Sequence, residues 1–401
     1  MNTLTNPQWR NVRLGDIGQS LIGLTYSPSN VKRSGTLVLR SSNIQDGELA
    51  FDDNVYVDCA IPEKIRTREN DILICVRNGS RRLIGKSAIL DRRVSGQTFG
   101  AFMAVYRSDL NPFLRYFFQS DDFKRQIDEH LGATINQITN GSLNGFVVTL
   151  PSKSEQQAIT ERLQDVDRLI ATLKRLISKK QAIKQGMMQE LLTGNTRLRG
   201  FTGKWESKTI GQLCVSIRGG GTPSKAIADY WGGQIPWATV KDLSKFNPKG
   251  TLDHISTRGV AESAARVVPA GELIVSVRML IARAVQFSVD VAINQDLKVL
   301  NLKQEVDPTF LRYWFNLNEE SFARAAGGST VSGISTTELA SKIVDLPPIE
   351  EQAGIAHVLQ DADEELNALM RRLQSARNVK DGMMQELLTG RTRLPIEEVS
   401  S

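Results

Sequence analysis

The chain has 401 residues, of which 40% are hydrophobic, and its 50 Lys and Arg residues against 44 Asp and Glu residues give a net charge of +6. This length allows two domains, and the mild basic excess is compatible with a polyanionic partner without requiring one. Cys59, Cys75 and Cys214 lie far apart without a CxxC pair, which argues against a disulfide framework and a zinc site. The same cysteine usage is typical of the reduced cytoplasm, and no apolar run approaches the roughly 18–20 residues of a membrane span, so we expect a soluble cytoplasmic protein.

Residues 1–150 alternate short β-rich runs with turns, which predicts a mixed α/β module. Three runs are expected to form strands: Thr36–Leu39, Asp71–Arg77 and Phe146–Leu150. A helix is expected at Pro112–His130, and it contains the string FLRYFF (113–118). These aromatic residues recur on one face, so we expect them to fill the core rather than to stack on nucleic-acid bases.

Loops of this first module carry polar and basic side chains that suit contacts with DNA. Bidentate Arg–guanine and Asn–adenine pairs discriminate between bases, while Arg and Ser also bind phosphates. For any single residue a solvated surface role is an equal alternative. The candidates are Arg40, Ser42, Asn43, Arg77, Asn78, Arg81 and Arg82.

Residues 151–198 form a helical segment, because no proline and only Gly186 interrupt Glu155 to Thr193. Its apolar residues recur in a heptad pattern typical of a coiled coil. The seam is interrupted by Lys180 and Lys184, whose long stems can lie along apolar surface. The predicted seam residues are Ile159, Leu163, Val166, Ile170, Leu173, Ile177, Met187 and Leu191.

Residues 199–346 form a second module of the same kind, with strands expected at Glu272–Arg278 and Lys298–Leu302 and a helix at Pro308–Ala326. That helix contains FLRYWF (310–315). The string RGGGTPSK does not fit the GxxxxGK[ST] pattern of a phosphate-binding loop, so we expect a Gly-rich turn. The candidate DNA contacts here are Arg218, Thr222, Ser224, Lys225, Thr239, Lys241, Arg278, Asn294 and Gln295.

The last segment, residues 347–401, repeats the first helical segment without a gap. Residues 347–394 match residues 151–198 at 23 of 48 positions, including GMMQELLTG in both copies. Trp9 and Trp205 are separated by the same 196 residues, which makes the whole chain two copies of one unit. The predicted seam residues are Ile355, Leu359, Leu366, Leu369, Leu373, Met383 and Leu387.

The connectivity predicts that the two helices are antiparallel if they pack together. The first helix ends where the second module begins, and the second helix begins where that module ends. The second helix then returns to the first module, so residues 391–401 should lie near residues 1–9. Two tandem domains, each with its own helical hairpin, remain the alternative.

Motifs for catalysis do not occur in this sequence. There is no Walker A motif, no NPPY-type or DPPY-type methyltransferase motif, and no Pro-Asp pair to begin a PD…ExK nuclease signature. His130, His254 and His357 stand in unrelated settings, and no nucleophile–base pair is indicated by spacing. We therefore expect no catalytic residue and no metal site in this chain.

The alternation of two divergent modules with two near-identical helical segments resembles the specificity subunits of type I restriction–modification systems. The resemblance covers essentially the whole chain. It depends on the duplicated PxxxEQ helix starts and MMQELLTG helix ends, together with GLTYSP (23–28), LRSSNI (39–44), GGGTPSK (219–225) and IPWATVKDL (235–243). It implies two α/β target-recognition domains, at 1–150 and 199–346, alternating with two long helices that form an antiparallel coiled coil with pseudo-two-fold symmetry.

The resemblance also implies a function for the chain. Each recognition domain would read one half of a split site on double-stranded DNA, and the helices would set the spacer and dock two modification subunits. S-adenosylmethionine would bind to those subunits, and ATP and magnesium to partner restriction subunits, with no cofactor on this chain. Two alternatives remain open: a coiled-coil scaffold that reads no DNA, and an enzyme with an unrecognised site.

Overall fold

The computed structural model describes residues 9–131, 136–325 and 333–395. The chain divides into two compact units, one made of residues 1–174 with 371–401 and the other of residues 175–370. Each unit therefore holds one β-rich module, one end of the first long helix and the opposite end of the second. Within the described residues, no helix combines the length and the apolar character that a membrane span requires.

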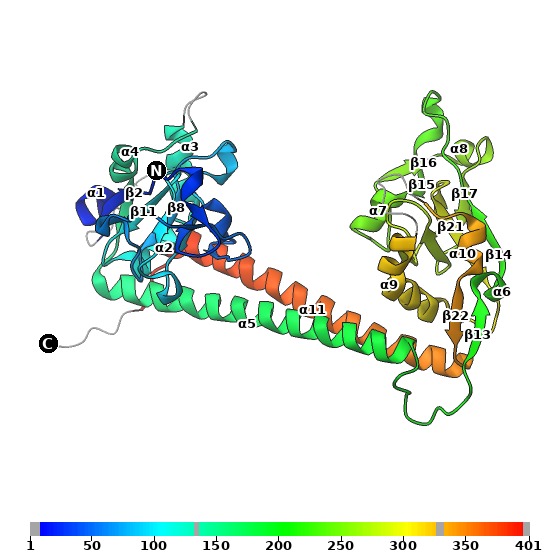
Figure 1. The fold of residues 1–401 in the computed structure, drawn as a ribbon. Helices are drawn as coiled ribbons and strands as arrows, with labels where there is room; N and C mark the ends of the chain where they lie inside the picture. Colours follow the sequence, from blue (N-terminus) through cyan, green and yellow to red (C-terminus); the bar gives the residue numbers. More distant parts are fainter. Residues whose placement is uncertain (1–8, 132–135, 326–332, 396–401) are drawn as a thin grey trace. The chain divides into compact units, whose positions relative to one another are not determined.

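The first module is built on a four-stranded antiparallel sheet with a second, smaller sheet beside it (Figure 1). The larger sheet has the order β2 (Gln19–Ile22), β11 (Met103–Arg107), β8 (Ile72–Cys75), β9 (Ser87–Ile89). The smaller has the order β10 (Thr98–Phe99), β4 (Thr36–Leu39), β7 (Tyr56–Val57), β3 (Val31–Lys32), with β10 parallel to β4. The remaining strands pair as β1 (Arg10–Arg13) with β12 (Val147–Leu150) and β5 (Ile44–Gln45) with β6 (Glu48–Leu49).

The second module repeats this plan. Its larger sheet has the order β14 (Cys214–Gly219), β21 (Leu297–Leu302), β18 (Leu273–Ser276), β19 (Ala284–Val285). Its second sheet has the order β16 (Asp253–Ile255), β15 (Trp231–Ala238), β20 (Val291–Ile293), β17 (Arg266–Val268), with β20 parallel to β15. The pair β13 (Glu206–Thr209) and β22 (Ile343–Leu346) has the register of β1 and β12 shifted by the 196 residues of the repeat. The predicted α/β class and internal duplication are confirmed.

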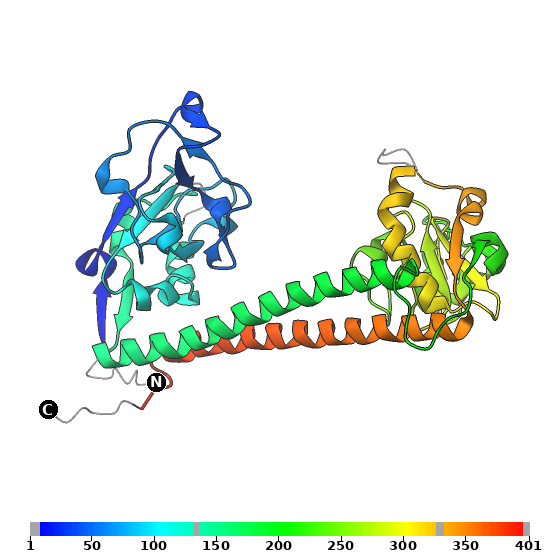
Figure 2. The same cartoon turned by 60° about the horizontal axis from the view of Figure 1, so that its bottom comes forward.

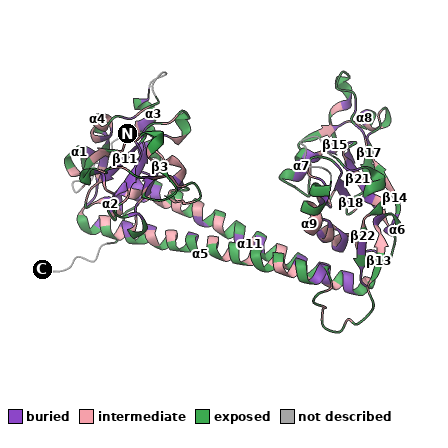
Figure 3. Cartoon of the chain, viewed as in Figure 1, coloured by how far each residue is buried: buried purple, intermediate pink, exposed green. Residues whose placement is uncertain are grey.

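Short helices complete both modules, and the aromatic strings lie in the core as predicted. The first module contains α1 (Leu14–Ile17), α2 (Asn111–Phe117), α3 (Asp121–His130) and α4 (Asn140–Gly145). The second contains α6 (Ile210–Leu213), α7 (Val240–Ser244), α8 (Thr257–Ala261), α9 (Pro308–Ala325) and α10 (Thr336–Ser341). Tyr116 and Tyr313 are essentially inaccessible, and buried residues fill the interior of each module (Figure 3).

One helix prediction was wrong in its extent. The expected helix Pro112–His130 is divided into α2 and α3, because Ser120 accepts a hydrogen bond from the Phe123 amide and begins a new helix there. Ala326, the expected end of the second module's helix, lies outside the described residues.

The two long helices are α5 (Lys153–Leu192) and α11 (Ile349–Leu387). In the first unit, the start of α5 packs beside the end of α11 (Figure 2), where Lys380 contacts Asp167 at 2.8 Å. In the second unit, Lys184 contacts Asp363 in the equivalent ion pair. Because the contacting residue number rises along α5 as it falls along α11, the helices are antiparallel, as predicted.

The predicted seam is largely buried. Val166, Met187, Leu373 and Met383 are half-buried, and the other predicted seam residues are buried. Met188 and Met384 are buried more deeply than the neighbouring methionines that the heptad pattern selected. The heptad pattern therefore misses by one position at the methionines, whereas Leu191 and Leu387, the last predicted seam residues, are buried as predicted.

A carboxylate on each helix joins the helices to the module. Asp167 accepts hydrogen bonds from the Tyr116 hydroxyl at 2.9 Å and from Arg115 at 3.1 Å, in addition to its contact with Lys380. In the second unit, Asp363 accepts from the Tyr313 hydroxyl at 2.6 Å and contacts Lys184. Burial raises the pKa of both tyrosines. We call these two groups the carboxylate junctions.

A tryptophan packs at the end of each long helix, and an ion pair lies beside it, Arg197 with Glu351 after α5 and Arg393 with Glu155 after α11. Gly194 and Gly390 have left-handed φ values of 73° and 71°, which is typical of a glycine that follows the end of a helix. Their α-carbons face the rings of Trp205 and Trp9, within 3.4 Å of where a side chain would begin. The end of α11 therefore lies at Trp9. The prediction that residues 391–401 lie near residues 1–9 also concerns residues 1–8 and 396–401, which are outside the described residues.

Candidate nucleic-acid interface

A cavity of about 650 Å³ lies at the strand ends of the second module. Three loops contribute to it: the turn after β14, the start of α7 after β15, and the residues after β20. These loops bring together five of the residues predicted as DNA contacts. They are Thr222, Lys225, Thr239, Lys241 and Asn294.

The first module has a cavity of about 530 Å³ at the corresponding strand ends. It collects Arg40, Ser42 and Asn78 from the predicted set, and it adds Tyr26 and Phe102. We refer to these two hollows as the first and second cavities. Both lie at loops that follow the same strands in the two repeats, so the fold places equivalent positions around each cavity.

Close backbone packing explains the glycine-rich turn. A side chain on Gly220 would begin 1.9 Å from the carbonyl oxygen of Ile293, and one on Gly23 would begin 2.2 Å from that of Gly100. Gly220 lets the chain pass the end of β20 and reach the second cavity at Thr222. Gly23 lets it pass the end of β10 and reach the first cavity at Thr25. The turn thus has a steric role that positions a cavity residue.

Short helical turns after β4 and β15 form a second wall of each cavity. The Thr239 hydroxyl donates to Asp242 at 3.0 Å, and the Thr239 amide donates to the same carboxylate at 2.8 Å. In the first module, Arg40 and Asn43 take the positions that Thr239 and Asp242 have in the second. The Arg40 backbone amide donates to the Asn43 side-chain oxygen at 2.9 Å. Asn43 is fully buried and its amide donates to the Ala50 carbonyl, so its predicted role as a DNA contact is replaced by a structural one.

Arg77 and Arg278 occupy equivalent positions after the central strands β8 and β18. Each forms an isolated β-bridge, Arg77 with Gln137 and Arg278 with Gly333. The Arg77 guanidinium lies 5.1 Å from the centroid of the Phe102 ring. Arg278 has 63% of its side chain exposed and lies 3.8 Å from Asp296, which is an ion pair without a hydrogen bond.

Three buried polar atoms of residues beside the cavities have no hydrogen-bond partner. Within the described residues, Arg40 Nε and Ser42 Oγ at the first cavity and Asp296 Oδ1 at the second are buried without such a partner. Buried polar groups in proteins are nearly always paired, and an exception calls for an explanation.

Further contacts distinguish the second module's candidates, some of which line the cavity while others lie at its edge or away from it. Asn294 is buried and donates to Asp296 at 3.2 Å, and Gln295 accepts from the Thr222 hydroxyl at 2.7 Å at the cavity edge. Arg218 is exposed on β14, and the Ser224 carbonyl accepts from the Trp231 indole at 3.1 Å. Asp296 lies in the same loop as Asn294 and Gln295 and was not among the candidate residues named from the sequence.

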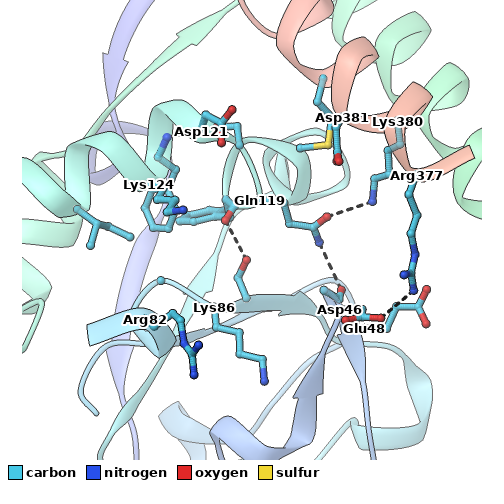
Figure 4. Close-up of a pocket in the computed structure, with 18 of the residues that line it drawn as sticks. Asp46, Glu48, Arg82, Lys86, Gln119, Asp121, Lys124, Arg377, Lys380 and Asp381 are labelled. Atoms are coloured by element: carbon cyan, nitrogen blue, oxygen red, sulfur yellow. Dashed lines mark hydrogen bonds and ion pairs between the residues drawn. The ribbon is translucent and has the colours of Figure 1, made fainter. Parts of the chain in front are cut away.

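Arg81 and Arg82 line a different hollow of about 780 Å³, between the first module and the long helices of the same unit (Figure 4). Arg377 of α11 contacts Asp46 there at 3.0 Å, and Lys380 donates to Gln119 at 3.2 Å. Arg81 donates to the Asp128 carbonyl at 3.1 Å. Since Arg377 and Lys380 of α11 bind residues of the module across this hollow, we interpret it as a packing contact between the module and the helices rather than as a ligand site.

No metal centre is indicated in the parts of the chain that the structure describes, where no group of three or more His, Cys, Asp and Glu residues could hold an ion. Cys59, Cys75 and Cys214 are free. Burial raises the pKa of Cys75 and raises that of Cys214 to about 11, which keeps both thiols protonated at neutral pH.

Comparison with known proteins identifies relatives of the whole chain. Residues 6–184 and 202–376 each match the family described as the type I restriction modification DNA specificity domain. The specificity subunit of the type I restriction enzyme StySPI from Salmonella potsdam is 24% identical over 409 residues, covering 95% of this chain and 87% of that protein. The MjaIX specificity subunit from Methanocaldococcus jannaschii is 31% identical over 166 residues, covering 40% of this chain and 38% of that protein.

A solved structure of similar fold comes from work on complex assembly and conformational transition of the type I R-M system. It has a TM-score of 0.62 and 19% sequence identity, and it covers 95% of this chain and 98% of that one. At this level of identity, the similarity establishes the fold. It includes both modules and both long helices, because nearly the full length of each chain is aligned.

Proposed function

The chain belongs to the family of type I restriction–modification DNA specificity proteins, and from this membership we propose that its first and second cavities each read one half of a split DNA site. The chain would act as the recognition subunit of a larger complex and would contribute no catalytic group of its own. Modification and restriction subunits would supply the chemistry.

The observation that carries this proposal is the repetition of the cavity. Arginines at equivalent positions, Arg77 and Arg278, contact Phe102 and Asp296, which line the two cavities together with hydroxyl, amide and amino groups. Arginine and amide side chains read base edges, while lysine and hydroxyl groups bind phosphates. The two cavities carry different side chains at equivalent positions of one fold, which would allow them to read two half-sites of different sequence.

The two long helices suit the tasks of spacing and docking. Each begins in one unit and ends in the other, and a helix of 40 residues such as α5 is about 60 Å long at about 1.5 Å per residue. We propose that the helices dock two modification subunits that bind S-adenosylmethionine. Restriction subunits that use ATP and magnesium would join this assembly.

Exchange of one module tests the proposal. Residues 20–130 would be replaced with the matching stretch of a related chain, and the methylated sequences of the host genome would be mapped. We expect new bases in one half of the methylated motif and no change in the other, because the two cavities belong to separate modules. New bases in both halves would contradict separate reading, and an undivided motif would contradict a split site.

A further inference from the structure

Position 102 in the first repeat corresponds to position 296 in the second. In the first module, the amides of Val76 and Arg77 donate to the Phe102 carbonyl. In the second, the Val277 amide donates to the Asp296 carbonyl. The strand pairings that follow agree, since Met103 pairs with Cys75 and Leu297 pairs with Ser276. The two residues therefore occupy one place in the shared fold.

The side chains at this place differ in chemistry while their neighbours agree. Phe102 lines the first cavity with 58% of its surface exposed, and the Arg77 guanidinium lies over its ring. Asp296 lines the second cavity, and its Oδ1 atom is buried without a hydrogen-bond partner beside Arg278. The exposed ring contacts the Arg77 guanidinium, and the Asp296 carboxylate is ion-paired with Arg278 at 3.8 Å, which is too far for a hydrogen bond, so the carboxylate keeps its capacity to accept one.

The chemistry of Phe102 and Asp296 indicates which groove of DNA the two cavities contact. A phenylalanine needs an apolar group, and the C5 methyl of thymine is exposed only in the major groove. A carboxylate accepts from exocyclic amino groups, which cytosine N4 and adenine N6 present in that same groove. Because both modules share one fold, they should face the same groove, and the major groove serves both residues.

We propose that position 102/296 is a base-reading position that gives the two half-sites different chemistry. Phe102 packs on a thymine methyl group in one half-site. Asp296 accepts a hydrogen bond from the amino group of a cytosine or an adenine in the other. This inference rests on the proposed function and adds to it the chemical groups read at one position of each half-site.

Modified DNA tests the Phe102 arm. The chain in complex with its modification subunits would be titrated with a duplex that carries its methylated motif. Replacing the thymines of the first half-site with deoxyuridine removes only methyl groups, and we expect wild-type affinity to fall about fourfold, as for about 0.8 kcal/mol per buried methyl-sized group. The Phe102→Ala complex should bind both duplexes equally, whereas the Phe102→Leu complex should keep part of the preference.

Two variants test the Asp296 arm. Asp296→Ala should relax one position of the second half-site, with a loss of about five- to a hundredfold in affinity for the original motif, which is the range of one base-specific pair. Asp296→Asn retains an acceptor and adds a donor, so it should favour adenine at that position. Replacing adenine with purine, which lacks the amino group, distinguishes adenine from cytosine as the base read by the wild type.

Controls separate this inference from the function on which it rests. Val215→Ala removes a side chain that is 74% exposed away from the cavity, and it should leave affinity and motif unchanged. Wild-type affinity that is indifferent to deoxyuridine, a first half-site without thymine, or an unchanged motif in Asp296→Ala would each overturn the inference. Failure of the wild-type complex to prefer any duplex would instead overturn the proposed function.

Discussion

The carboxylate junction of the first unit should contribute more to stability than any surface ion pair on the same helix. In Asp167→Ala, the Tyr116 hydroxyl loses its acceptor in a place where the ring is inaccessible, and Lys380 and Arg115 lose their partner. Leaving a buried donor unpaired costs about 1–3 kcal/mol, and lost hydrogen bonds to a charged group add a comparable amount. We therefore expect unfolding to become easier by about 2–4 kcal/mol.

The repeat offers matched comparisons. Asp363→Ala should have a similar cost in the second unit, because Asp363 accepts from Tyr313 and contacts Lys184 in the same way. Asp165→Ala is the control, since Asp165 pairs with Arg168 on the exposed side of α5 and such pairs contribute about 0–1 kcal/mol. Urea unfolding of the full chain measures all three. An Asp167→Ala variant as stable as Asp165→Ala would refute the role of the junction.

Three further outcomes are expected. Gly220→Ala should destabilise the chain by about 1–3 kcal/mol, because its side chain would begin 1.9 Å from the Ile293 carbonyl oxygen. Gly250→Ala should be neutral in the same unfolding assay, because the nearest atom to its side chain would be Asn247 Nδ2 at 4.0 Å, an ordinary contact distance. Burial raises the pKa of Glu155, but hydrogen bonds from Arg393 and Ser152 outweigh this effect and lower the pKa below its ordinary 4.5. The ionised carboxylate therefore stabilises the folded chain fully above that pH, and this stabilisation is lost as the pH falls. Glu155→Gln should accordingly lose less stability than the wild type between neutral and acidic pH. Four helix-forming residues inserted near Ser178 should widen the unspecified spacer of the methylated motif by about one or two base pairs, since they add about 6 Å of helix and adjacent base pairs lie about 3.4 Å apart.

The sequence predicted those parts of the fold that depend on periodicity and repetition. The heptad pattern and the duplicated helix ends predicted α5 and α11, because each extends over many residues, and the connectivity predicted their antiparallel pairing. The break at Ser120 was missed, since a single side-chain cap interrupts an otherwise helical pattern. The carboxylate junctions were missed because Tyr116 and Asp167 lie 51 residues apart, and only the folded chain brings them together.

For the candidate site, residue type in the sequence identified some of the residues that line the cavities but also selected residues that do not contribute to them. Thr222, Lys225, Thr239, Lys241 and Asn294 do lie together, because each follows a strand end at the same edge of the module. Asn43 was selected for its amide, yet that amide supports its own loop. Phe102 and Asp296 were not selected, because their importance depends on exposure and unpaired atoms, which a sequence does not display.

Methylation mapping of two single-residue variants tests the central claim most directly. Arg77→Ala and Arg278→Ala alter equivalent positions in the two modules, and each would be supplied as the sole specificity subunit in the host cell. The account predicts that the wild-type motif is split, that Arg77→Ala relaxes or weakens one half, and that Arg278→Ala does the same to the other half alone. Two variants that affect the same half, or that leave the motif unchanged with full methylation, would contradict it.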